Sequence, residues 1–492
     1  MASEQAGIVA AGHPLTAEAG ARVLREGGNA VDAAIAALLT SFVAEPLLTG
    51  LGAGGYLLTA GGDAEPALLD FFVEATGDPV APRAELLGVD VSFGDAAQVF
   101  YVGPASCGLY GAPAGVCEAA ARWGSRPVSE LAAPAAALAE RGVTINAEQA
   151  YIAEILTGIL QSTPECAALW SPQGRVLREG EVLLNPELAE ALRRLGAEGA
   201  DPFYRGDIAV AASEWVGARG GSLPLAQLAA YEAVVREPVR IRYRDREVLT
   251  NPPPAAGGIL LAYAFGLLDL IDSPPPLTAI VDAMAMAQAE RTDAFVLGLG
   301  EPGFLERFVA SRLGSTTHIS VLDAEGRACS VTCTNGEGSG VVVPGTGLHL
   351  NNIMGEIDLN PLGFHRHRPG RRMPSMMAPS VVLRDGAVEL VLGSAGSNRI
   401  RSAILQTVVG VVDHGLRAAE AVCAPRVHFE DHKVYVEPGI DTDELAAAGR
   451  DLVHFRALNL FFGGVQAVQR DPATGQLFGG GDPRRGGVAV AA

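Results

Sequence analysis

Two stretches of this chain place hydroxyl side chains where a nucleophile could form. The first, at residues 316–320, reads TTHIS and follows Ser315, and the second ends at Thr334. An internal Thr can be both nucleophile and base only after the peptide bond before it breaks. Its new amine then has a pKa of roughly 8 and can accept the proton of its own hydroxyl near neutral pH. The sequence around Thr316 fits that chemistry, which makes Thr316 the candidate nucleophile.

Thr316 and Thr334 belong to two predicted strands, 316–322 and 328–334, which flank the turn sequence DAEG. A hairpin centred near Glu325 pairs residues whose numbers add up to about 650, so Thr316 lies opposite Thr334. Opposed residues have Cβ atoms about 4.5–5.5 Å apart, which lets the two hydroxyls meet. A register shift of one residue would turn Thr334 to the other face. The alternative is that both are ordinary strand residues, because Thr is common in strands.

A second candidate element is the small-residue turn GSAGSN at 393–398. The sequence predicts a strand at 388–392 before it and a helix at about 399–412 after it. A turn at a helix N-terminus presents backbone N–H groups that lack helical partners. Such groups can stabilise an oxyanion. The alternative is a plain connection between a strand and a helix.

The composition indicates an acidic enzyme with a sizeable core. Hydrophobic residues make up 49% of the 492 residues, and the formal net charge of −20 argues against nucleic acid as a partner. None of the six Cys has CxxC spacing, so neither a zinc site nor a redox motif is indicated. The longest apolar run, 259–268, is too short to span a bilayer. The start of the chain has no basic region followed by an apolar one, so we expect a cytoplasmic protein and no membrane partner.

The stretch 127–312 is predicted to be mostly helical, and strands and turns dominate after 316. Helices are expected at 16–25, 30–43, 127–141, 145–160, 184–195, 206–219, 224–232, 258–272, 278–298 and 303–312, and a buried strand at 66–75. A loop at 360–372 is rich in Pro and Arg. His365 and His367 are candidate metal ligands there, but their Arg neighbours argue against a cation. We therefore expect no metal site and assign the loop as solvated or as an anion-binding rim.

These segments together resemble the γ-glutamyltranspeptidase family of N-terminal-nucleophile hydrolases. The resemblance covers nearly the whole chain in order, at residues 12–37, 45–58, 316–334, 338–352, 393–416, 424–430 and 479–487. It implies an α+β fold, a four-layer αββα sandwich, made by one precursor that cleaves itself between Ser315 and Thr316. The large subunit would be 1–315 and the small subunit 316–492, the two intertwined as one domain. No metal or organic cofactor is implied.

The resemblance also implies roles for single residues. It makes Thr316 the nucleophile, Thr334 its hydrogen-bonding support, and the backbone amides of Gly396 and Ser397 the oxyanion hole. Three further residues align with the part of the family site that holds the donor, although two of them differ in type or position. These are Glu356 at the position of an amine-binding Asp, Ser375 as the one remaining Ser of a pair, and Asn335 next to the position where the family has Asn.

The part of the family site that recognises glutamate is largely missing. Typical members hold the donor carboxylate with an Arg in an Asp-Phe-Arg-Glu segment, and here residues 70–74 read DFFVE, without Arg. A bidentate Arg has no substitute in Phe. Phe72 is at or next to that Arg position and is expected to line an apolar wall of the acyl site. Gly336 stands where the family has Asn, and Ile353 where it has Gln.

The sequence therefore predicts an enzyme that keeps the acyl-Thr chemistry with an altered donor. It would hydrolyse or transfer a γ-glutamyl-like acyl group from a small-molecule donor to water or an amine acceptor. One alternative is a carbon–carbon bond hydrolase, as in actinobacterial relatives of the lincomycin and pyrrolobenzodiazepine routes, because that chemistry needs the acyl-Thr but not the glutamyl clamp. Another is a non-catalytic scaffold.

Overall fold

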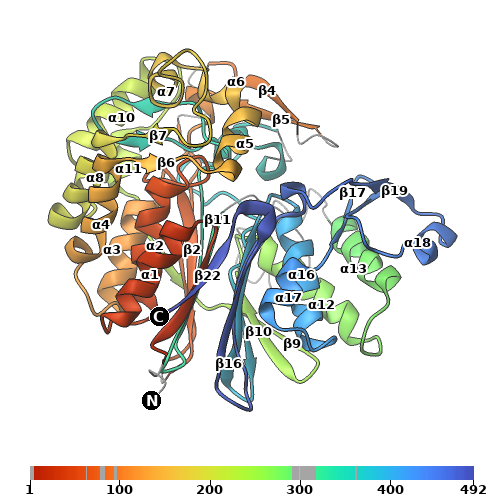
Figure 1. Ribbon diagram of the computed structural model, residues 1–492. Coiled ribbons are helices and arrows are strands. Elements are labelled where there is room, and N and C mark those ends of the chain that lie inside the picture. The colour runs from red at the N-terminus through yellow and green to blue at the C-terminus, as the bar shows by residue number, and fades with distance from the viewer. Residues whose placement is uncertain are drawn as a thin grey trace.

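Two stacked β-sheets form the centre of the structure, and helices cover their outer faces (Figure 1). This computed structural model describes residues 5–62, 64–77, 84–92, 97–290, 299, 317–360 and 363–492. The four layers confirm the αββα sandwich expected from the sequence. Among the described residues, no helix combines the length and the hydrophobicity needed to cross a bilayer.

The first sheet has seven strands, and each neighbouring pair is antiparallel. In spatial order they are β22 (Val488–Ala491), β1 (Gly7–Ala11), β11 (Thr317–Asp323), β12 (Ala328–Thr334), β2 (Gly54–Ala60), β3 (Ala67–Phe71) and β8 (Val234–Arg236).

The second sheet has six antiparallel strands. Their order is β21 (Leu477–Gly481), β20 (Gly464–Arg470), β16 (Ala387–Ala395), β15 (Ser380–Arg384), β10 (Arg246–Thr250) and β9 (Val239–Tyr243). Both sheets contain strands from before and after residue 316. The two halves of the chain are therefore interleaved within each sheet.

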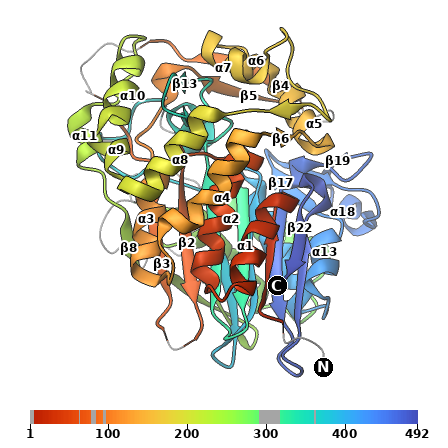
Figure 2. The same ribbon diagram turned by 60° about the vertical axis from the view of Figure 1, so that its left-hand side comes forward.

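One helical layer covers the first sheet, as the turned view shows (Figure 2). Its helices are α1 (Pro14–Arg25), α2 (Ala30–Ala44), α3 (Ala112–Trp123), α4 (Val128–Arg141) and α8 (Pro186–Glu198). Helix α2 begins with a capping box between Asn29 and Asp32, and all of its residues are buried. A helix that is apolar on every side belongs inside a protein, and α2 lies between the sheet and other helices.

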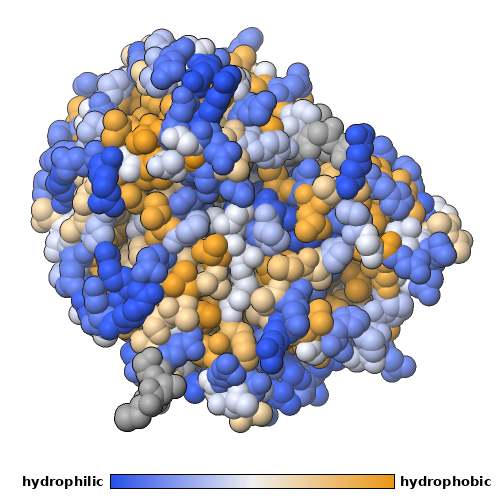
Figure 3. Space-filling view, in the orientation of Figure 1, coloured by the Kyte–Doolittle hydropathy of each residue, from blue (hydrophilic) through white to orange (hydrophobic). Residues whose placement is uncertain are grey.

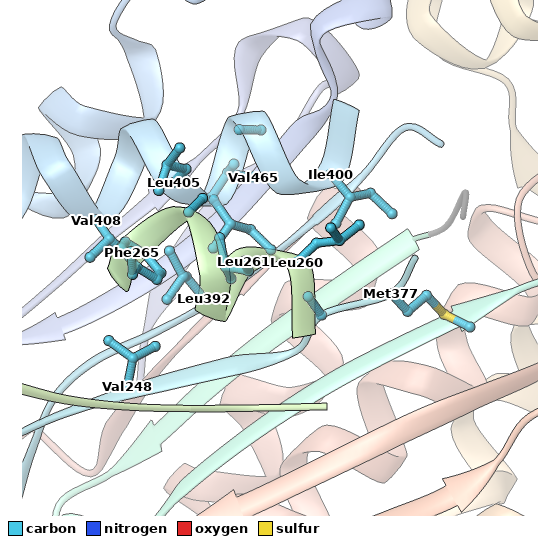
Figure 4. Close-up of a cluster of buried hydrophobic side chains, with 14 of the residues drawn as sticks. Val248, Leu260, Leu261, Phe265, Met377, Leu392, Ile400, Leu405, Val408 and Val465 are labelled. Carbon is cyan, nitrogen blue, oxygen red and sulfur yellow. The ribbon is translucent and has the colours of Figure 1, made fainter. Parts of the chain in front are cut away.

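The other helical layer covers the second sheet. It consists of α12 (Gly257–Asp269), α13 (Leu277–Ala289), α16 (Arg399–Val412) and α17 (Ala418–Cys423). Side chains of α12 and α16, such as Phe265 and Leu405, pack on strand residues such as Val248, Leu392 and Val465 (Figure 4). This packing holds the start of α16 in place beneath the turn at 393–398.

The remaining elements form a lobe above the first sheet and an extension of the second layer. The lobe contains β4 (Leu87–Ser92), β5 (Ala97–Val102), β6 (Val143–Thr144), α5 (Ala147–Ile155), α6 (Thr157–Leu160), α7 (Pro164–Trp170), β7 (Val182–Leu183), α9 (Asp201–Tyr204), α10 (Asp207–Gly217), α11 (Leu225–Ala229), β13 (Val342–Val343) and β14 (Leu348–His349). The extension contains β17 (Val427–Glu430), β18 (Lys433–Val436), α18 (Asp443–Ala447) and β19 (Asp451–His454).

Several predicted boundaries differ from the observed ones. The helix expected at 145–160 is divided into α5 and α6, and the strand expected at 66–75 ends at Phe71. The helix expected at 278–298 ends at Ala289 within the described residues, and the one expected at 303–312 lies outside them. Short elements such as β4 and β5 carried no strong periodic signal.

The predicted register of the central hairpin is confirmed wherever β11 and β12 are described. Thr317 pairs with Cys333 and His318 with Thr332, so the numbers of paired residues add up to 650. The turn is held by Asp323, whose carboxylate accepts hydrogen bonds from the backbone N–H of Arg327 at 2.8 Å and of Ala30 at 3.1 Å. Asp323 thereby ties the hairpin to the start of α2.

His318 lies in a polar cluster between the two sheets. Its Nδ1 is 2.8 Å from Thr332 Oγ1 and its Nε2 is 2.9 Å from Ser320 Oγ. Ser320 Oγ also donates to the carbonyl of Gln466 in the second sheet at 3.0 Å. Burial lowers the pKa of His318 to about 3, so the ring is neutral at neutral pH. Gly393 makes room for it, because a Cβ there would lie 2.4 Å from the ring.

Replacing His318 with Ala should destabilise the protein most at neutral pH. The variant leaves the Thr332 hydroxyl without its partner, which costs roughly 1–3 kcal/mol. In the wild type, the neutral ring contributes its full stability above a pH of about 6.5, and that contribution is lost as the pH falls toward 3. The stability difference from His318→Ala should therefore shrink between pH 7.5 and pH 5, as measured by urea unfolding. The exposed His414→Ala is the control, and a pH-independent difference for His318→Ala would contradict the neutral assignment.

Candidate active site

The site begins where β11 starts beside a buried carboxylate. Thr317 Oγ1 donates to Glu45 Oε2 at 3.0 Å, and Thr16 Oγ1 donates to Glu45 Oε1 at 2.7 Å. Burial raises the pKa of Glu45. Both oxygens of this acid are thus engaged, and Glu45 anchors the first described residue of β11. The predicted nucleophile Thr316 and the preceding Ser315 lie outside the described residues.

Thr334 ends β12 in a tight turn. Its Oγ1 accepts a hydrogen bond from the backbone N–H of Gly336 at 2.7 Å. In the part of the chain that the structure describes, no acceptor takes the hydrogen of the Thr334 hydroxyl, so that hydrogen is available to a neighbour. Asn335 is buried, and its amide donates to the carbonyl of His349 at 3.3 Å, which shapes the turn.

The turn from β16 into α16 lies where the sequence predicted it, and its backbone is unusual. Gly396 has a φ of 121° and Ser397 a φ of 55°, a conformation that non-glycine residues seldom adopt. The Ser397 hydroxyl donates to Asp358 Oδ2 at 2.8 Å, and the amide of Asn398 donates to the same oxygen at 3.3 Å. These contacts hold the strained turn in one shape.

A pocket brings the two turns together. Gly336 and Glu337, directly after Thr334 and Asn335, line it along with Gly396 and Ser397. The pocket has roughly 640 Å³ of empty space, part of it open to solvent, and is lined by residues of α5 and α16, which Figure 1 labels. The surface of the molecule mixes hydrophobic and hydrophilic residues (Figure 3). The pocket wall is mostly apolar, formed by Leu47, Leu48, Phe100, Ile152, Ile155, Leu156, Leu460 and Phe461, with Arg399 and Arg485 as its cations.

Three acids gather behind the pocket. Burial is the main cause that raises the pKa of Glu337 to about 7 and the pKa of Glu356 well above its usual range, and the charges of neighbouring acids add to both. Asp358 is one of these neighbours and also binds Ser397. The sequence predicted only Glu356 at this site. Glu337 comes three residues after Thr334, and this position in the sequence could have predicted it as a site residue.

Two predicted substrate residues lie away from the pocket wall. Phe72 is fully buried, stacks on Tyr56 with ring centroids 5.5 Å apart, and is not part of the pocket wall described here. It belongs to the hydrophobic core that the two sheets share. Ser375 is buried as well, and its Oγ accepts the backbone N–H of Met377 at 3.1 Å. Both side chains support the fold here.

The last residue of the Arg-rich loop, Arg372, forms buried ion pairs and is not part of an exposed rim. Arg372 is buried, and its Nη1 lies 2.8 Å from Glu74 and its Nε 3.1 Å from Asp70. Its guanidinium also stacks over the ring of Tyr231. Asp70 and Glu74, the two acids of the segment where typical family members carry the missing Arg, are thus occupied by Arg372. The His367 ring contacts the carbonyl of Leu359 at 3.1 Å.

Comparisons with known proteins agree on one family. The model of the family described as Gamma-glutamyltranspeptidase matches residues 16–309 and 303–492. The chain is 32% identical to the Acylase ACY 1 proenzyme of Pseudomonas sp. (strain SE83), over 100% of this chain and 94% of the relative. It is 30% identical to the Glutathione hydrolase proenzyme of Escherichia coli (strain K12), over 97% of this chain and 90% of the relative. The crystal structure of cephalosporin acylase from Bacillus halodurans superposes with a TM-score of 0.83 at 26% identity, covering 99% of this chain and 96% of that one.

Restoring the family Asn at the turn should disturb this site. A Cβ on Gly336 would lie 2.1 Å from Asn352 Oδ1 and 2.3 Å from Glu356 Oε1. Overpacking of this kind typically costs roughly 1–3 kcal/mol. Gly336→Asn should therefore lower the melting temperature, measured by calorimetry. Gly345→Asn is the matched control, because Gly345 has a similar φ of 73° and no atom within 4 Å of its added Cβ. Equal melting temperatures for the two variants would show that the turn can widen.

Proposed function

The chain belongs to the γ-glutamyltranspeptidase family, and within that family of hydrolases and acyltransferases we propose a particular role for it. It is a self-processing amide hydrolase whose Thr316 forms the acyl ester and whose donor is not a γ-glutamyl group. Cleavage between Ser315 and Thr316 would produce subunits 1–315 and 316–492. The proenzyme names of its relatives support a precursor of this kind.

The hairpin register supports the pairing of Thr316 with Thr334. Thr317 pairs with Cys333, and the same register continued by one residue would join residues 316 and 334. The hydroxyl hydrogen of Thr334 is not taken by any acceptor among the described residues. Thr334 can donate it to the oxygen of Thr316 and hold the nucleophile in its attacking rotamer. Glu45 acts one residue further along, by anchoring Thr317.

The reaction follows from these roles. The Thr316 amine takes the proton of its own hydroxyl, and the oxygen attacks the amide carbonyl of the donor. The backbone N–H groups of Gly396 and Ser397 stabilise the oxyanion that forms. The C–N bond breaks, the amine leaves with the proton, and an acyl ester remains on Thr316. Water then attacks the ester, and the free acid leaves.

One observation carries the assignment of an altered donor: no Arg from residues 70–74 is available to bind a glutamyl carboxylate. Phe72 is buried in the core, and Arg372 is engaged with Asp70 and Glu74. Glu356, at the position that binds the donor amine in the family, has a pKa raised well above its usual range by burial. A neutral carboxyl is a poor partner for an ammonium group. Both halves of the clamp for an α-amino acid are therefore weak, and the acylase relatives agree with such a donor.

Self-processing gives the first test. Purified wild-type protein should run as two polypeptides on a denaturing gel, and intact mass should show Thr at the start of the smaller one. Thr316→Ala should remain a single chain, because the hydroxyl that attacks the preceding carbonyl is gone. The same cleavage in Thr316→Ala would disprove the nucleophile assignment.

Thr334→Ala serves as the companion variant in that test. It keeps the nucleophile and removes only the supporting hydroxyl. A catalytic hydrogen bond of this type is worth on the order of 10²–10³ in kcat. Full turnover by a processed Thr334→Ala enzyme would mean that Thr334 supports the turn and not the nucleophile.

The donor preference gives the second test. This chain lacks the Arg that binds the glutamyl carboxylate, so γ-glutamyl p-nitroanilide should be a poor donor. Its kcat/KM should be about 30- to 5,000-fold lower than with a typical family member, as expected when one partner of a buried charge pair is lost. Saturable hydrolysis of glutathione with micromolar KM would return the protein to the γ-glutamyl class. Processed protein that cleaves no amide at all would instead favour the carbon–carbon hydrolase alternative.

A further inference from the structure

Arg485 is a cation beside the oxyanion turn that the proposed mechanism does not use. Its side chain crosses Gly464, where an added Cβ would lie 2.4 Å from Arg485 Cδ. Its Nη2 lies 3.5 Å from the position that a Cβ would take on Gly396. Its Nε is buried and has no hydrogen-bond partner. The guanidinium therefore lies within a few ångströms of the turn proposed to hold the reacting carbonyl.

The neighbouring Arg484 shows what a structural arginine looks like in this fold. It lies 3.1 Å from Asp482, pairs with Glu437, and donates to the carbonyls of Val422 and Ala424. No such set of partners surrounds Arg485 in the part of the chain that the structure describes. A guanidinium has five N–H donors, and leaving the buried Nε donor of Arg485 without a partner costs free energy. Arg485 thus has an N–H donor that a ligand could use.

Arg399 lies on the same pocket wall in a similar condition. Only 7% of it is exposed, and its Nε is buried without a hydrogen-bond partner. Its guanidinium stacks over the ring of Phe461, 4.1 Å from the centroid, and its ion-pair contact is a loose one of 3.7 Å to Glu430. Two arginines from segments far apart in the chain thus face one pocket with donors to spare.

The pocket wall carries two cations, Arg399 and Arg485, and one acid. Glu337 is the acid on the pocket wall, and burial and the nearby Asp358 raise its pKa to about 7, so it carries only part of its negative charge at neutral pH. Burial lowers the pKa of Arg485 to about 10, which leaves it charged. The other acid close to Arg485 in the same segment, Asp482, is already paired with Arg426 and Arg484. Two further acids lie close: Glu45 beside Arg485, with its oxygens accepting from Thr16 and Thr317, and Glu430 beside Arg399, in contact with His428. An anion would compete with these acids for the two guanidiniums.

We propose that Arg485 and Arg399 form a carboxylate subsite, and that the physiological donor is the monoamide of a dicarboxylic acid whose free carboxylate binds there. This inference rests on the proposed amide hydrolysis. A planar guanidinium matches a carboxylate bidentately. The apolar wall formed by Leu47, Phe100 and Ile152 suits the methylene chain between the two carbonyl groups. Water and the amide then yield a free diacid and an amine.

The experiment compares donors that differ in one charge. Processed wild-type enzyme is assayed with glutaryl p-nitroanilide and valeryl p-nitroanilide, which share the leaving group and the chain length. Wild type should prefer the glutaryl donor by about 30-fold or more in kcat/KM, the range expected for a buried charge pair. Arg485→Met and Arg399→Met should each reduce this preference at least tenfold, mainly through the KM of the glutaryl donor. Arg485→Lys should retain part of it, because the charge remains while the planar fork is lost.

The control variant is Arg219→Met. Arg219 stacks on Trp215 and pairs with Glu165, and it lines none of the pockets found in the described residues. The Arg219→Met variant should prefer the glutaryl donor over the valeryl donor by the same factor as the wild type. An arginine variant of the pocket could fail to process itself. In that case calorimetry measures the binding of free glutarate and valerate to processed wild type, and the subsite predicts that glutarate binds at least tenfold more tightly.

Three outcomes would overturn the subsite, and each differs from failure of the proposed function. The first is equal turnover of glutaryl and valeryl donors, and the second is an unchanged preference in both arginine variants. The third is a preference for a carboxylate on the leaving amine in place of the acyl group. N-valeryl-4-aminobenzoate, which carries its carboxylate on the amine, tests this. In all three the enzyme still cleaves amides, so the acyl-Thr function stands. No processing and no cleavage of any amide would instead refute the function itself.

Discussion

The pairing of β11 with β12 in a single register is the constraint on which the site depends. Asp323 closes the hairpin and ties it to the start of α2. At the other end, Glu45, which follows α2, holds the Thr317 hydroxyl. One helix thus anchors both ends of β11. A shift of one residue would exchange the two faces of these strands, moving Thr334 away from its turn and His318 away from the cluster between the sheets.

Burial is the second physical theme of the site. Desolvation keeps His318 neutral, which allows it to join hydroxyls between the two sheets. The same effect raises the pKa of Glu337 and Glu356, so that acids beside the pocket lose charge while guanidiniums keep theirs. An arginine resists deprotonation far better than a carboxylate resists protonation. A buried pocket with both groups therefore becomes more positive than its composition suggests.

The proposed function separates the elements that would carry the reaction from those that would recognise the donor. The hairpin, the strained turn at Gly396 and Ser397, and the interleaved sheets all remain. In this chain Phe72 stacks on Tyr56 in the core, and Arg372 pairs with Asp70. The fold tolerates this because the β-sandwich and the nucleophile do not depend on which group binds the far end of a donor.

The sequence by itself determined the elements whose signals are local. The turn at 323–326 with its flanking strands predicted the register, and the small residues at 393–398 predicted a turn between a strand and a helix, because both depend on backbone preferences of neighbouring residues. Together with the family motifs, they indicated the fold and Thr334. Tertiary structure decided the rest. Whether Phe72 faces a pocket or the core depends on Tyr56 across the sheet, and whether an arginine is used or spare depends on distant partners. Arg399 and Arg485 come from segments that only the fold brings together. Their spacing in the sequence does not predict that they line the same pocket.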